Sequence, residues 1–185
     1  MKLRKVTISK KSILDAHPSL PKVYKNIINI LYTEILQNQD QVKVFEVDKL
    51  IKKNGRNDLS PLNEVKDKVG VYIFINKNCE PVYVGLAGES SNSKHSLKGR
   101  LQKQLNADLS NSTLAKNIRD IEGLLQNNQE ILKIRDRKRL KELICKYTAY
   151  IIAIITGELQ DDNAIEDAKS LEKVLIALLR PKYNK

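Results

Sequence analysis

Apolar residues recur at helical spacing along much of the chain, which predicts five longer helices. The first begins at Pro21, because proline suits the first turn of a helix, and ends at Asn38. The last has a strongly apolar face and is stopped by Pro181. The helices are expected over residues 21–37, 97–105, 112–125, 135–146 and 164–179.

Three further segments are rich in β-branched and aromatic residues and predict strands. Residues 69–75 and 81–84 are separated by the turn residues Asn76, Lys77 and Asn78, which predicts a hairpin. Residues 147–156 read as a buried strand. A shorter alternation at 42–47 predicts a small strand nearer the N-terminus, followed by a helical turn that Asn54 and Gly55 close.

The most linker-like stretch is 57–61, so we place a soft domain boundary near residue 66. Residues 1–66 are expected to form a mainly helical N-terminal extension. Residues 67–185 are expected to form an α+β domain, in which helices flank a small three-stranded antiparallel sheet.

Charge then narrows the class of partner. The 185 residues carry 33 Lys and Arg against 22 Asp and Glu, a net charge of +11. A basic surface of this kind attracts polyanions, of which nucleic acid is the commonest and an anionic membrane the other. The longest apolar run, Ala149 to Ile155, is far short of the ~20 residues of a membrane span. No signal peptide is apparent, so a cytoplasmic protein without membrane contact is expected.

Cysteine and histidine usage excludes two classes of small domain. Cys79 and Cys145 are the two cysteines, and the histidines are also two. They make neither a disulfide framework nor the clustered ligand spacing of a structural zinc site.

Two half-motifs lie in the predicted hairpin. Gly70-Val71-Tyr72 is followed after ten residues by Tyr83-Val84-Gly85. Arg100 then lies on the helix after the second strand, Glu172 on the last helix, and Asn184 in a Pro-x-x-Asn element near the end. In this order the motifs, over roughly residues 68–185, resemble the GIY-YIG nuclease family, with Val in place of Ile in both half-motifs. The plain alternative is a pair of ordinary strands with half-buried tyrosines.

The resemblance implies a metal-dependent endonuclease that hydrolyses phosphodiester bonds, most similar to stand-alone or restriction-type members. It implies that Tyr72 is the general base and that Tyr83 binds water and phosphate beside it. Arg100 would bind phosphate through its planar fork. Glu172 would bind one Mg²⁺ or Mn²⁺, which prefer oxygen ligands. The set is completed by Asn184, which would hydrogen-bond within the site and order the last helix, and by Gly70 and Gly85, which would let backbone approach the substrate.

Two positions depart from the family. Leu86 stands where many members have lysine, and Gln104 where many have histidine. Either missing residue could help to polarise a tyrosine, and Lys94, His95 and Lys103 are the candidates to replace them. Basic residues that could contact DNA phosphates are Lys49, Lys52, Lys53, Arg56, Lys98 and Lys103. A solvated surface explains these lysines and Arg56 equally well, and a catalytically weak or inactive nucleic-acid-binding module, or RNA as substrate, are the alternatives for the function.

Overall fold

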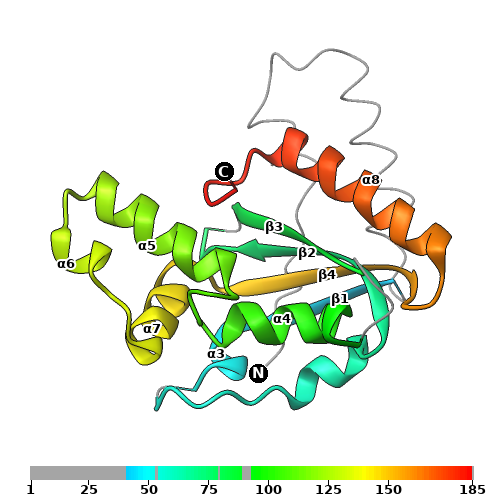
Figure 1. Cartoon of the computed structure of the whole chain (residues 1–185), viewed down its shortest axis with the longest axis horizontal. Helices are drawn as coiled ribbons and strands as arrows, with labels where there is room; N and C mark the ends of the chain where they lie inside the picture. The colour runs from blue at the N-terminus through cyan, green and yellow to red at the C-terminus, as the bar shows by residue number, and fades with distance from the viewer. Residues whose placement is uncertain (1–40, 53, 79, 89–92, 185) are drawn as a thin grey trace.

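The computed structural model describes residues 41–184, apart from residues 53, 79 and 89–92. They form an α+β fold in which helices pack on both faces of a four-stranded antiparallel sheet (Figure 1). The helix expected over 21–37 lies outside these residues. In chain order the elements are β1 (Val42–Glu46), α3 (Val47–Leu50), the 3-10 helix η2 (Ser60–Val65), β2 (Lys68–Ile75), β3 (Pro81–Ala87), the 3-10 helix η3 (Ser93–His95), α4 (Leu97–Leu105), α5 (Thr113–Leu125), α6 (Gln129–Leu132), α7 (Arg137–Tyr147), β4 (Tyr150–Glu158) and α8 (Asp162–Leu179).

The expected three strands are corrected to four, in the order β1-β4-β2-β3. β1 pairs antiparallel with β4, so that Val44 lies opposite Ile152. The sequence predicted this short strand but assigned it to the N-terminal extension, because the alternation in 42–47 does not reveal a partner more than a hundred residues away. Leu50 and Val65 are also buried in the core of the sheet, so the described residues before position 66 pack with those after it.

The central strand β2 is buried on both faces, which explains why residues 69–75 are almost continuously apolar. Tyr72 and Phe74 point into a core shared with α4, α5 and α7. Val71 and Ile73 point into a second core, where α8 contributes apolar residues such as Leu171. Figure 1 shows α8 on one side of the sheet and α4 and α5 on the other.

Side-chain caps fix where the helices begin. Ser96 caps α4, Ser112 caps α5 and Asp136 caps α7, each by accepting a backbone N–H of the first turn. α8 ends at Arg180, which takes a left-handed conformation with φ of 44° just before Pro181. No helix in the described part of the chain is both long and apolar enough to cross a bilayer.

The C-terminal segment after α8 is held between β3 and α5. The Tyr183 backbone N–H donates to the carbonyl of Val82 at 2.8 Å, and the Tyr183 hydroxyl donates to Glu122 at 2.7 Å. Asn117 donates its side-chain amide to the Tyr183 carbonyl at 2.8 Å. Tyr183 is only 1% exposed, so the residues around it are fixed rather than frayed.

Candidate functional site

Tyr72 lies at the middle of β2, opposite Gly85 of β3, and its side chain has no exposed surface. A Cβ added at Gly85 would stand 2.5 Å from both the Cζ and the hydroxyl oxygen of Tyr72. Gly85 is therefore required because the Tyr72 ring lies across it. Tyr83 packs beside this ring, with the ring centroids 6.3 Å apart.

Gly70, the first glycine of the half-motifs, has a structural role in the pairing of β2 with β4. Its φ of +154° is one that L side chains rarely adopt, and a Cβ there would lie 1.9 Å from the carbonyl oxygen of Ile154. The register between β2 and β4 shifts at this point, between Val69 and Gly70. Gly70 thus lets β4 pass close to the strand that carries Tyr72.

Gln104 of α4 holds the Tyr72 hydroxyl. Its Oε1 accepts hydrogen bonds from the Leu114 backbone N–H at 3.0 Å and from the Ser112 hydroxyl at 3.2 Å. Because the Leu114 backbone N–H can only donate, it fixes the orientation of the amide, and Nε2 donates to the Tyr72 oxygen at 3.1 Å. Gln104 is 2% exposed. Position 104 was expected to lack a contribution because the family's histidine is absent there. The i, i+4 spacing, which puts Arg100 and Gln104 on one face of α4, was the signal available in the sequence.

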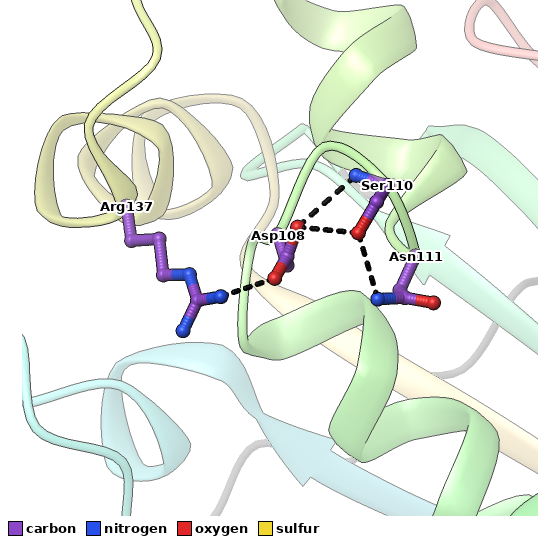
Figure 2. Close-up of polar contacts among 4 residues, drawn as sticks. All are labelled: Asp108, Ser110, Asn111 and Arg137. Atoms are coloured by element: carbon purple, nitrogen blue, oxygen red, sulfur yellow. Dashed lines mark hydrogen bonds and ion pairs between the residues drawn. The ribbon is translucent and has the colours of Figure 1, made fainter.

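The loop between α4 and α5 fixes Ser112 in turn. Figure 2 shows Asp108 accepting hydrogen bonds from the backbone and the hydroxyl of Ser110, at 3.1 and 2.7 Å, while its other oxygen pairs with Arg137 of α7. The Asp108 carbonyl accepts the Ser112 backbone N–H at 2.6 Å. The ion pair with α7 therefore steadies the residue that orients Gln104.

Arg100 approaches the same tyrosine from the first half of α4. Its Nε donates to the Leu86 carbonyl at 3.3 Å, which holds the side chain against β3. Leu86 itself, where the resemblance suggests a lysine, is buried in the core shared with α8. Its contribution to the site is therefore its backbone carbonyl.

Opposing effects act on the acidity of the two tyrosines. Burial raises the pKa of Tyr72 above its usual range, while the charge of Arg100 and the Gln104 hydrogen bond lower that pKa and the charge of Glu172 raises it. Burial also raises the pKa of Tyr83, with the charge of Tyr72 next in importance. Both phenols are consequently neutral at neutral pH, although two donors face the Tyr72 oxygen.

Glu172 lies on α8 between buried positions, is partly buried itself, and acts electrostatically on both tyrosines. Its carboxylate supplies oxygen ligands, the type that Mg²⁺ or Mn²⁺ prefers, with several waters kept. A cation at this carboxylate would offset the negative charge that raises the two pKa values. The donor chemistry therefore fits the ion that the resemblance implies, with Glu172 as its protein ligand.

Asn184 joins the end of α8 to the edge strand. Its side-chain oxygen accepts the Val84 backbone N–H at 2.8 Å, and its side-chain nitrogen donates to the Val84 carbonyl at 2.8 Å. Val84 follows Tyr83 directly, so Asn184 positions the strand that carries Tyr83. The structure thus brings together six of the candidate residues: Tyr72, Tyr83, Gly85, Arg100, Glu172 and Asn184.

The predicted basic residues separate into two groups. Lys94, Lys98 and Lys103 line one cavity beside α4, and His95 follows Lys94, with its carbonyl accepting the Gly88 N–H at 2.7 Å.

The other group follows β1, at the opposite edge of the sheet from β3. Lys49 pairs with Glu46 at 2.9 Å and Lys52 with Asp58 at 3.1 Å. Arg56 is exposed, and Lys53 lies outside the described residues. The structure does not bring Lys49, Lys52 and Arg56 to the tyrosines.

Comparison of the chain with protein-family models, curated proteins and solved structures gave no match.

Proposed function

We propose that the protein is a GIY-YIG nuclease that hydrolyses phosphodiester bonds in DNA with the help of one Mg²⁺ or Mn²⁺. The observation that carries this proposal is the environment of the Tyr72 oxygen. Gln104 donates to it, Arg100 stabilises a negative charge on it, and Tyr83 and Glu172 lie within electrostatic range. These side chains come from two strands and two helices. A phenylalanine at position 72 would fill the same space in the core, so packing does not explain the hydroxyl group of Tyr72.

The residues have complementary roles in such a reaction, which needs an activated water and compensation of charge on the phosphoryl oxygens. Burial raises the pKa of Tyr72, so the phenol would first have to lose its own proton to solvent, helped by the charge of Arg100, the hydrogen bond from Gln104 and a bound cation. The phenolate oxygen would then take the proton of the attacking water. The Arg100 fork would bind phosphate oxygens, and Tyr83 would orient water and phosphate. The metal ion, held by Glu172, would supply Lewis-acid stabilisation of the phosphoryl charge.

One observation favours the second candidate, a nucleic-acid-binding module without catalysis. Tyr72 is fully buried, and Tyr83 is 7% exposed. A general base must reach its water, so side chains around Tyr72 have to move when substrate binds. If they do not move, the same residues form a rigid core beneath a basic surface.

A plasmid-cleavage assay separates the two candidates. The wild-type protein should nick or linearise supercoiled DNA with magnesium and stop when a chelator is added. Tyr72→Phe should lose about 10²–10⁴-fold in rate, the usual contribution of a general base. Tyr150→Phe is the matched control, because Tyr150 lies in the same sheet at the start of β4 and should cut normally.

Three results of this assay would change the proposal. Absence of magnesium-dependent cutting by wild-type protein that binds DNA would support the binding module instead. Cleavage of an RNA hairpin but not of DNA would transfer the proposal to RNA. Equal rates for Tyr72→Phe and wild type would refute the assignment of the base.

A further inference from the structure

A cavity of ≈ 340 Å³ lies beside α4, on the side away from the tyrosines. Four lysines line it, and among its described lining residues Asp67 is the one acid. The lining therefore carries three net positive charges. The lysines are Lys66, Lys94, Lys98 and Lys103.

Several contacts give this lysine pocket a defined shape. Lys98 donates to the Asn63 side chain at 2.7 Å, which holds its ammonium group toward η2. Asp67 adopts a left-handed conformation with φ of 57°, and its carbonyl accepts the Leu159 N–H at 2.9 Å. The Asp67 carboxylate lies 3.8 Å from Lys66, so the acid is partly offset by a lysine of the same rim.

The pocket and the candidate site share one helix. Gly99, Gln102 and Lys103 line the pocket, whereas Arg100 and Gln104 face the tyrosines. A helix with its side chains is about 10–12 Å across, so the two sites are about that far apart. Phosphates of one DNA strand follow each other at about 3.4 Å along the axis, and this separation corresponds to a few nucleotides.

We propose that the lysine pocket binds a backbone phosphate of the nucleic acid, a few nucleotides away from the bond that is cut. This inference rests on the proposed function and specifies how the substrate is held. Lysine ammonium groups bind phosphate as point charges, without the geometry that reads a base. The described lining also contains no aromatic ring on which a base could stack. The pocket thus sets the position of the strand and not its sequence preference.

The test is DNA binding as a function of salt, measured by fluorescence anisotropy with a short duplex and the full chain, in chelator so that no DNA is cut. The variant is Lys98→Ala with Lys103→Ala, since alanine preserves the helix. The matched control is Lys77→Ala with Lys133→Ala, which removes the same charge from exposed positions outside the pocket. Each lost phosphate contact lowers the slope of log K against log salt by about 0.9, so the pocket variant, which gives up one phosphate, should lose about 0.9 and the control almost nothing.

Equal losses of slope in both double variants would overturn the inference, because they would show a response to total charge alone. An unchanged slope in the pocket variant would also overturn the inference. If that variant still cut DNA, the proposed function would stand without it. A pocket variant that loses only its affinity for pyrophosphate would assign the cavity to a small anion instead. A wild-type protein that binds no duplex would remove the proposed function and this inference together.

Discussion

Gln104→Glu reverses the direction of one hydrogen bond while leaving the shape of the side chain unchanged. One carboxylate oxygen can still accept from Leu114 and Ser112, as the amide oxygen does at 3.0 and 3.2 Å. The other replaces an N–H that now donates to Tyr72 at 3.1 Å. The Tyr72 hydroxyl must then donate and can no longer be the acceptor.

The size of the effect follows from that distance. Two unit negative charges separated by 3.1 Å repel by about 5 kcal/mol at an effective dielectric constant of about 20. The substitution therefore raises the pKa of Tyr72 further and opposes any step in which its oxygen accepts a proton. We expect cleavage to fall by about 10²–10⁴-fold, as for loss of a general base. The substitution should also cost stability, on the order of several kcal/mol, because the new carboxylate is buried.

The assay is single-turnover cleavage over a range of pH, with urea unfolding measured on the same preparations. Gln129→Glu is the control, because it makes the same chemical change at an exposed position in the first turn of α6. The variant should recover part of its rate as pH rises, whereas the control should follow wild type. A folded Gln104→Glu protein that cuts at the wild-type rate would refute a proton-accepting role for Tyr72.

Three more predictions follow from the same geometry. Glu172→Ala should abolish magnesium-dependent cleavage but keep duplex affinity, and loss of both in binding and cleavage assays would contradict a metal-ligand role. Gly85→Ala should destabilise the fold by about 1–3 kcal/mol in urea, because its Cβ would lie 2.5 Å from the Tyr72 ring. Burial raises the folded-state pKa of Tyr72, Tyr83 and Tyr183. Their contribution to stability is complete below about pH 10 and is lost as pH rises further, by about 1.4 kcal/mol per tyrosine and pH unit. Phenolate absorbance that reaches the value for all seven tyrosines before the chain unfolds would contradict this.

The elements with strong local signals were predicted well from the sequence. α8 and the β2–β3 hairpin were predicted from periodicity and turn residues, and the helix expected over 112–125 is α5, which Ser112 caps. Ends were less accurate, since α7 runs to Tyr147, which the sequence analysis placed in the following strand. The pairing of β1 with β4 was missed because it depends on contacts between distant segments, which a local pattern does not contain.

The candidate residues named from the sequence lie near one another in the structure, but their contacts could not be predicted. Motif order indicated Tyr72, Arg100 and Glu172, yet it treated Gln104 as an absence. The amide contacts Tyr72 because Leu114 fixes its orientation. The i, i+4 spacing of Arg100 and Gln104 indicates a shared helix face, but it does not reveal this contact. The sequence also does not show which face of β2 Tyr72 lies on, because β2 is apolar throughout and has no alternation of polar and apolar residues.

The two hydrogen bonds between Asn184 and Val84 have a consequence for the sheet as a whole. β3 is an edge strand, and an uncovered edge offers its N–H and C=O groups to the strands of other molecules. Asn184 occupies both groups of Val84, and the backbone of Tyr183 occupies the carbonyl of Val82. Tyr183 and Asn184, in the segment after α8, therefore make the hydrogen bonds to β3 that a fifth strand would make. We therefore expect this segment to hinder pairing with the strand of a neighbouring copy at the edge where Tyr83 lies, and so to limit aggregation there.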